Sequence, residues 1–152
     1  MSTTIYWFSG TGNSLAVARA IGEGIEGAEL VPIASAIGGR HIHVEGVIGI
    51  VCPVYFYSLP LIVKEFIARL DASKADYAFV VLTMGGVLGM AIEHARRLFR
   101  LAGKRLDAEY AMMMPGNYIA QYNVRGAAAV QRMTTRAAPD RWGACFSSLP
   151  RR

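Results

Sequence analysis

Five apolar runs constrain the fold of this chain more than any other feature of its sequence. They are rich in Val, Ile and aromatic residues and cover residues 4–8, 28–33, 46–52, 77–83 and 107–114. Runs with so little polar alternation are typical of strands that are buried on both faces. Stretches with helical spacing of their apolar residues separate them. This alternation predicts an α/β fold, a small doubly wound parallel sheet with helices on both faces and right-handed crossovers.

The helical patterns differ in strength along the chain. The expected helices cover residues 13–25, a short stretch within 34–45, 59–70, 88–102 and about 126–136. The clearest is 59–70, where the apolar residues recur with spacings of three and four and form one continuous stripe. Ser58 is a candidate N-cap for it, and Pro60 suits its first turn. In the helix 88–102, His94 is expected to be exposed on the polar side.

Length and composition predict a single domain. The chain has 152 residues, of which 53% are apolar and 18% charged, a globular balance. We assign residues 1–138 to the domain and 139–152 to an irregular C-terminal tail. No apolar run approaches the roughly 20 residues of a membrane span. The N-terminus enters a strand without the pattern of a signal peptide. We therefore expect a cytoplasmic protein with no membrane partner.

The charged residues, cysteines and histidines argue against nucleic-acid binding, a disulfide framework and a metal site. The net charge of +5 is interpreted as a solvated surface, and no motif indicates nucleic-acid binding. The two cysteines, Cys52 and Cys145, form neither a disulfide framework nor a metal-ligand cluster. Cys52 is interpreted as a buried structural thiol. His41 and His43 have no third ligand nearby, so no metal site is predicted.

Six small residues follow the first predicted strand. They are Ser9, Gly10, Thr11, Gly12, Asn13 and Ser14. In a doubly wound sheet, ligands bind beyond the carboxyl ends of the strands, and the turn after the first strand borders that crevice. Small residues let backbone N–H groups converge on an anion, and the following helix directs its positive end toward the turn. We predict that this turn binds a phosphate.

The spacing within this turn distinguishes it from other phosphate motifs. The Gly-x4-Gly-Lys-Ser/Thr pattern of nucleotide P-loops and the Gly-x-Gly-x-x-Gly pattern of dinucleotide sites are both absent. A turn without Lys or Arg suits a monophosphate that neutral donors hold. The alternative is a tight turn with a helix N-cap, which needs only one or two such residues and fits six in succession less well.

Two later loops should reach the same crevice. One contains Pro53, Val54, Tyr55, Phe56, Tyr57 and Ser58, and the other Thr83, Met84, Gly85 and Gly86. Aromatic side chains in the first loop can stack on a flat ring, which contributes roughly 0.5–1.5 kcal/mol each beyond burial. The alternatives are that these rings cap the core and that the second loop is only a turn. A phosphate at one end and a planar ring at the other match the shape of flavin mononucleotide (FMN).

Several motifs carry a resemblance to a known family. "IYWFSGTGNSLAVARAI", "PVYFYSLPLIVKEFI", "TMGG" and "MMMPGNY" resemble the flavodoxin-like domain of the bacterial and archaeal flavodoxin/ferredoxin fusion family. The resemblance implies a flavodoxin-like three-layer sandwich with a five-stranded parallel sheet of order 2-1-3-4-5, and FMN as cofactor. It assigns residues 9–14 to the phosphate and 53–58 and 83–86 to the two sides of the isoalloxazine. It also places Asn117 and Tyr118 beside the ring.

The chain departs from that family in three respects. Family members continue into a ferredoxin domain with two clusters of four cysteines, whereas this chain has two cysteines in total. We therefore expect a separate redox partner protein, such as a ferredoxin or another iron–sulfur protein. Free flavodoxins are usually acidic, whereas this chain is basic. The loop 53–58 contains no glycine, although many flavodoxins have one there whose peptide responds to flavin reduction.

Three functions are compatible with these observations. The leading hypothesis is an electron-transfer protein that binds FMN non-covalently and needs no catalytic acid or base. The alternative is an NAD(P)H-dependent FMN reductase acting on a quinone-like acceptor, for which no nicotinamide site is evident. The third is a flavin-free anion-binding scaffold left from a split fusion protein. The oligomeric state is not predicted.

Overall fold

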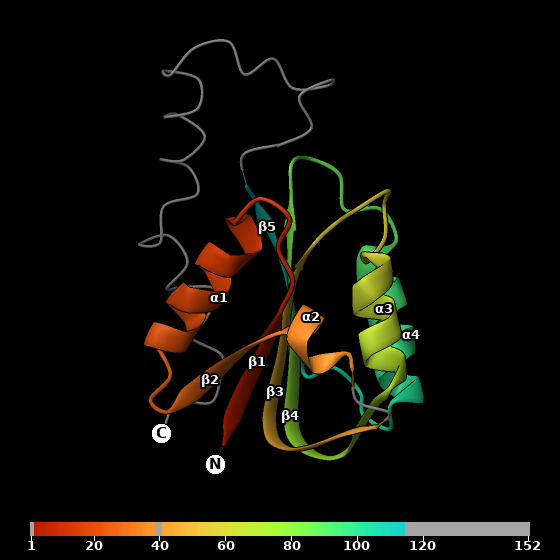
Figure 1. Ribbon diagram of the computed structural model, residues 1–152. Helices are drawn as coiled ribbons and strands as arrows, with labels where there is room; N and C mark the ends of the chain where they lie inside the picture. Colours follow the sequence, from red (N-terminus) through yellow and green to blue (C-terminus); the bar gives the residue numbers. More distant parts are fainter. Residues whose placement is uncertain (1, 39–40, 115–152) are drawn as a thin grey trace.

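Strands and helices alternate along the chain in the computed structural model, which describes residues 2–38 and 41–114. The elements are β1 (Thr3–Trp7), α1 (Asn13–Glu23), β2 (Ala28–Pro32), α2 (Ile33–Ala36), β3 (Ile42–Pro53), α3 (Leu61–Ala68), β4 (Leu70–Met84), α4 (Ala91–Leu101) and β5 (Ala108–Met113). All neighbouring strands pair in parallel, in the order β2-β1-β3-β4-β5. The predicted doubly wound sheet and its strand order are confirmed (Figure 1).

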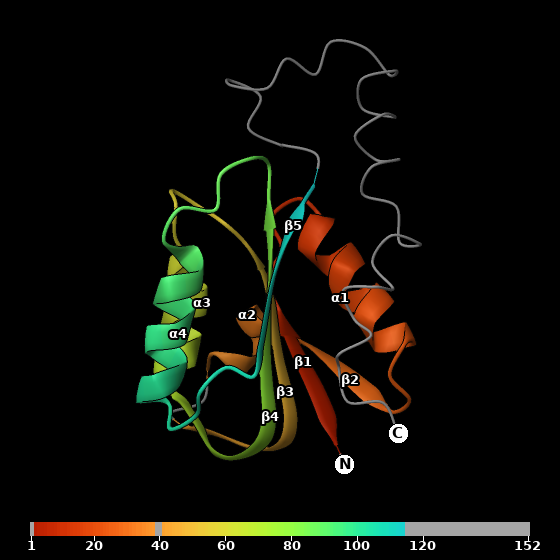
Figure 2. The ribbon, with the colours of Figure 1, turned by 180° about the vertical axis from the view of Figure 1, so that it is seen from behind.

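The sheet separates two layers of helices. In the described part of the chain, α1 covers one face, whereas α2, α3 and α4 lie on the other (Figures 1 and 2). Alternate residues of β3 contribute to different cores: Ile48 and Ile50 pack toward α3, and Val47 and Val51 pack toward α1. Because both faces of the central strands are covered, their sequences are continuously apolar.

Two strands are longer than the sequence patterns predict. β3 begins at Ile42 rather than residue 46, and β4 begins at Leu70 rather than residue 77. Their early parts pair with each other from Ile42 with Leu70 onward, and polar residues such as His43 and Lys74 are exposed there. Pairing between segments about 28 residues apart is a tertiary interaction, so the local apolar pattern did not reveal it.

Helix boundaries also differ from expectation. β2 ends at Pro32 and α2 covers Ile33–Ala36, so the short helix expected within 34–45 begins one residue before that range, in the last residue of the predicted strand. α3 ends at Ala68 because the chain enters β4 at Leu70. Pro60 occupies its N-cap position, so the prediction of Ser58 as N-cap is wrong. α4 begins at Ala91 rather than residue 88.

The helix expected near 126–136 and the tail 139–152 lie outside the described residues. None of the helices in the described ranges is both long and apolar enough to cross a membrane.

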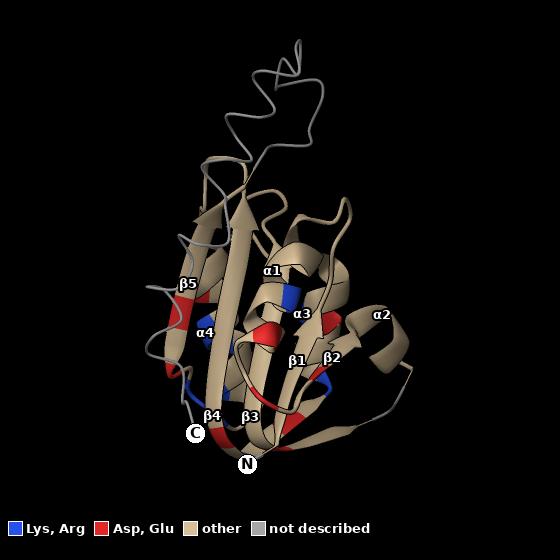
Figure 3. Ribbon diagram, turned by 90° about the vertical axis from the view of Figure 1, so that its left-hand side faces the viewer, with Lys and Arg blue, Asp and Glu red and all other residues tan. Residues whose placement is uncertain are grey.

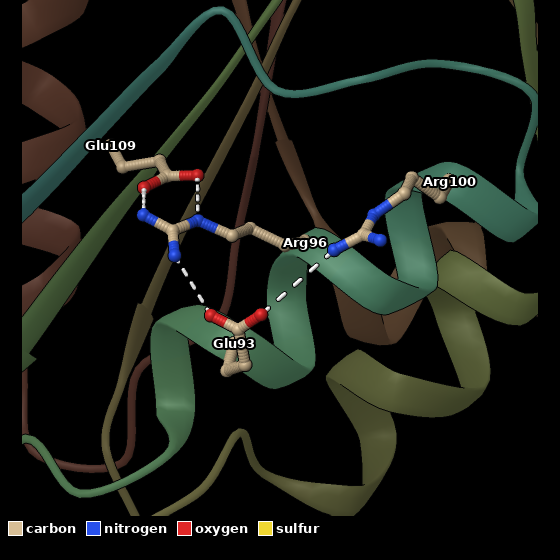
Figure 4. Close-up of polar contacts among 4 residues, drawn as sticks. All are labelled: Glu93, Arg96, Arg100 and Glu109. Atoms are coloured by element: carbon tan, nitrogen blue, oxygen red, sulfur yellow. Dashed lines mark hydrogen bonds and ion pairs between the residues drawn. The ribbon is translucent and has the colours of Figure 1, made fainter.

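An ion-pair network attaches α4 to the edge strand β5 (Figure 4). Nε and Nη2 of Arg96 on α4 donate to the two carboxylate oxygens of Glu109 on β5, at 2.7 and 2.6 Å. Nη1 of Arg96 donates to Glu93 at 2.8 Å, and Arg100 lies 3.9 Å from the other oxygen of Glu93. Hydrogen bonds from Arg96 to Glu109 and then Glu93 raise the pKa of the guanidinium. The paired geometry holds α4 in a defined position against the sheet.

Candidate functional site

The three loops that the sequence singles out lie together at one edge of the sheet. They connect β1 to α1, β3 to α3 and β4 to α4, and all three lie at the top of Figure 1. β1, β3 and β4 are the central strands, and their carboxyl ends meet there because they run parallel. We call this region the carboxyl edge.

The glycine-rich turn, residues 9–14, enters α1 through a left-handed residue. Gly12 occupies the N-cap position with φ +97°, and a Cβ atom there would meet no other atom within 4 Å. The position therefore requires glycine for its backbone conformation and not for lack of space. The N–H of Gly12 donates to Ser9 Oγ at 2.9 Å, which folds the turn back on itself. Amide groups at the first turn of α1 lie beside it, with the positive end of the helix.

A buried hydrogen bond attaches this turn to the end of β4. Ser14 Oγ lies 2.8 Å from Thr83 Oγ1, and either hydroxyl can be the donor. The two residues are only 1% and 3% exposed. The sequence predicts both as ligand contacts, and the structure adds that their hydroxyls contact each other. The bond fixes the start of α1 against the last residues of a central strand.

Tyr55 brings the second loop over the glycine-rich turn. Its hydroxyl lies so close to Gly10 that a side chain at that glycine would overlap it. Its ring also packs edge-on against Phe8, with centroids 6.3 Å apart and an interplanar angle of 86°. The second loop also contacts β4: the N–H of Val54 donates to the carbonyl oxygen of Thr83 at 2.8 Å. All three loops are therefore in mutual contact.

Residues 55–58 form a tight two-residue hairpin that we call the aromatic turn. Tyr55 and Ser58 exchange two backbone hydrogen bonds of 2.9 and 3.0 Å, and between them Phe56 and Tyr57 have φ of +48° and +60°. Turns of this hand normally contain Asn or Gly, because a left-handed backbone costs other residues about 1–2 kcal/mol each. The aromatic turn therefore stores backbone strain.

The strained backbone directs aromatic side chains outward. Phe56 is 98% exposed and Tyr57 62% exposed, whereas Tyr55 is partly covered. The alternative that these rings cap the core is therefore wrong for Phe56 and Tyr57. Strain held at such a place is typical of a ligand-contacting segment.

The three described loops of the carboxyl edge lack charged side chains. Residues 5–18, 46–63 and 77–92 contain no Lys, Arg, Asp or Glu. Figure 3 accordingly shows the charges on the helices and toward the opposite ends of the strands. Cys52, at the end of β3, is fully buried, and burial raises the pKa of its thiol. This confirms Cys52 as a structural thiol, because a protonated buried thiol is a poor nucleophile.

Some of the remaining predicted site residues lie at the ends of β3 and β4, and others lie outside the described residues. β4 ends at Met84, and Gly85 and Gly86 follow as an exposed bend. Pro53 is the last residue of β3. Asn117 and Tyr118 lie outside the described residues.

Sequence reasoning missed His94. It is expected as an exposed residue of α4, whereas it is half-buried and its Nδ1 lies 2.6 Å from Ser58 Oγ. The only available signal was its place next to Ala95, at the border of the apolar stripe of the helix.

Comparisons with solved structures return flavodoxin-like proteins. A two-electron reduced flavodoxin from Megasphaera elsdenii is 20% identical, with a TM-score of 0.57, and the match covers 76% of this chain and 89% of that one. A flavoprotein from Lactobacillus acidophilus in complex with FMN is 15% identical, with a TM-score of 0.56 and coverages of 72% and 92%. A flavodoxin from the domain Archaea is 16% identical, with a TM-score of 0.53 and coverages of 88% and 99%.

Comparisons of the sequence alone do not assign the chain to a family. No family model and no curated protein sequence matches the chain. At the identities of the structural matches, the similarity establishes the fold: this chain has the flavodoxin-like α/β fold that its strand order indicates.

Proposed function

We propose that this chain binds FMN non-covalently at the carboxyl edge and acts as an electron-transfer protein. The observation that carries the proposal is the convergence of the three loops. The Ser14–Thr83 hydrogen bond and the contact of Tyr55 with Gly10 hold a glycine-rich turn and an aromatic turn side by side. The fold supports it as well, because one structural neighbour is a complex with FMN and others are flavodoxins.

The glycine-rich turn fits a phosphate monoester. The turn is exposed from Gly10 to Gly12, lies at the positive end of the 11-residue helix α1, and has no carboxylate in residues 5–18 to repel an anion. Hydroxyl and amide donors would hold the phosphate without a cation. Thr11, in the middle of the turn, is the residue whose hydroxyl we assign to the phosphate.

The aromatic turn fits the ring end of the same ligand. Tyr55, Phe56 and Tyr57 supply flat apolar surfaces, and Gly85 and Gly86 are two positions of the β4–α4 loop that have no side chain to obstruct a ring. Bound FMN would supply the electron chemistry, whereas these residues would orient the ring and exclude water from it.

The resemblance to the flavodoxin/ferredoxin fusion family supports a cytoplasmic chain that works with a partner. We propose that the chain is the flavodoxin part of such a system and that its partner is a ferredoxin or another iron–sulfur protein. The cluster would lie on the partner, because the two cysteines of this chain are too few to ligate one.

An FMN titration of the purified chain followed by absorbance tests the proposal. The flavin bands should shift on binding, and Thr11→Val should weaken FMN binding by about 1–3 kcal/mol, or roughly 5- to 150-fold. Thr4→Val, near the start of β1 at the opposite end of the sheet, is the matched control and should bind like the parent. Absence of FMN binding at micromolar concentrations would leave the flavin-free scaffold. Steady NADPH oxidation with a quinone and no added reductase would indicate the reductase instead.

A further inference from the structure

The aromatic turn rests on the beginning of α4. The carbonyl oxygen of Tyr57 accepts a hydrogen bond from the N–H of Met90 at 2.9 Å. Gly89, with φ +58°, lies so close to Tyr57 that a Cβ atom there would overlap the Tyr57 side chain and backbone. The backbone of the turn is therefore held from the α4 side.

A side-chain hydrogen bond adds to this contact. Ser58, the last residue of the turn, places its Oγ 2.6 Å from Nδ1 of His94 in a partly buried position. His94 lies one helical turn after Met90, and its own N–H donates to the Met90 carbonyl oxygen at 2.9 Å. The same stretch of α4 thus contacts both the backbone and a side chain of the turn.

Burial cannot hold this turn in its conformation. Phe56 is almost wholly exposed and Tyr57 largely so, although both have left-handed backbone. Residues kept in such conformations relax unless surrounding contacts over-determine them. Other contacts are therefore needed: Tyr55 packs on Phe8, the Tyr57 carbonyl oxygen accepts from Met90 at the N-cap of α4, and Ser58 bonds to His94.

α4 is a suitable support because it is fixed independently. The paired hydrogen bonds of Arg96 to Glu109 connect the helix to β5 (Figure 4). A residue that acts on a site through another is effective when its own element is rigid.

We propose that His94 is a positioning residue: through Ser58 it holds the aromatic turn in the strained conformation that presents Phe56 and Tyr57 at the carboxyl edge. This goes beyond FMN binding, since the effect on the turn exists in the flavin-free protein. Only its consequence for ring binding rests on the proposed function.

Three single variants, the double variant His94→Phe/Ser58→Ala and one control test the Ser58–His94 bond. His94→Phe keeps a ring but removes the nitrogen, and Ser58→Ala removes the other partner. His94→Asn places a polar atom near the position of Nδ1 and should restore the bond. Arg97→Ala, an exposed residue of the same helix, is the control.

Limited chymotrypsin digestion of the flavin-free protein measures the state of the turn. The exposed Phe56 and Tyr57 are cleavage sites, and a tight hairpin must open before a protease can bind it in extended form. Loss of one hydrogen bond should raise the rate of cleavage after these residues by about fivefold in His94→Phe and Ser58→Ala. The double variant should be cleaved no faster than either single variant, because both changes remove the same bond. His94→Asn and Arg97→Ala should match the parent.

Equal cleavage of the parent, His94→Phe and Ser58→Ala would overturn the proposal. Ser58→Ala, the smaller change, decides the question if circular dichroism shows that His94→Phe is unfolded. An FMN titration of the same variants separates this proposal from the function. If the parent binds no FMN but cleavage follows the expected order, the proposed function fails and the positioning role stands. If the parent binds FMN and cleavage is unchanged, the positioning role fails alone.

Discussion

The glycine-rich turn and the aromatic turn reach a left-handed backbone by opposite means. In the first, the left-handed residue is Gly12, which adopts φ +97° without strain and with open space around it. In the second, Phe56 and Tyr57 adopt positive φ although neither is a glycine. The left-handed residue of the first turn costs no strain, whereas contacts such as Ser58 with His94, 36 residues away, must hold the strained backbone of the second.

This difference has a consequence for function. A turn that is locally stable can present backbone amides to a ligand in a fixed arrangement. A turn held by distant contacts can be adjusted by changing those contacts, without changing the exposed rings. Under the proposed function, the phosphate end of the site has an unstrained backbone and the ring end is held in a strained backbone by contacts with α4.

The largest expected effect comes from Gly12→Val, which removes the conformational freedom of the first turn. A β-branched residue at φ +97° should lower the free energy of unfolding by about 3 kcal/mol, measured by urea denaturation. Gly38→Val is the matched control, because Gly38 lacks a positive φ and a Cβ atom there meets nothing within 4 Å; it should stay within about 0.5 kcal/mol of the parent. Equal effects of the two variants would show that Gly12 has no special conformational role.

The next effect concerns the buried bond between the first turn and β4. Ser14→Ala or Thr83→Val should each lower the free energy of unfolding by about 1–3 kcal/mol, since the remaining hydroxyl is left buried without its partner. The double variant should lose less than the sum of the two single losses. Strict additivity in urea unfolding would mean that the two hydroxyls are not coupled.

Phe56→Gly should change the free energy of unfolding by a smaller amount, and it should raise this free energy rather than lower it. Relief of the left-handed strain, partly offset by the entropy of glycine in the unfolded chain, should raise the free energy of unfolding by up to about 1 kcal/mol. Little burial is lost because Phe56 is 98% exposed. The same variant should bind FMN more weakly. A fall in stability would mean that the positive φ is not strained.

The smallest effect is expected for Arg96→Lys, which tests the support of the second turn. Lys cannot donate two parallel hydrogen bonds to Glu109, so the melting temperature should fall slightly. The side chain of Arg96 is 46% exposed, and the difference from the parent should shrink in about 1 M NaCl. A large loss that is independent of salt would contradict a surface ion pair.

Sequence patterns predicted the parallel sheet and singled out the three loops that the structure brings together at the carboxyl edge. The continuous apolar runs identified the five strands, because burial on both faces leaves no polar alternation. The glycine-rich turn was recognisable from composition alone. Strand lengths, the start of α4 and the role of Ser58 were not, because pairing of Ile42 with Leu70 and contact of Ser58 with His94 join distant segments.

The amino-acid sequence by itself determined the alternation of strands and helices, a turn whose glycines permit a left-handed residue, and the absence of charge near the carboxyl ends of the central strands. These properties depend on each residue and its near neighbours. Only the tertiary structure decided that Ser14 meets Thr83, that Tyr55 crosses Gly10 and that two aromatic residues are held in a strained turn. The physical reason is that those arrangements take their stability from contacts between segments that the sheet brings together, and no local pattern encodes such contacts.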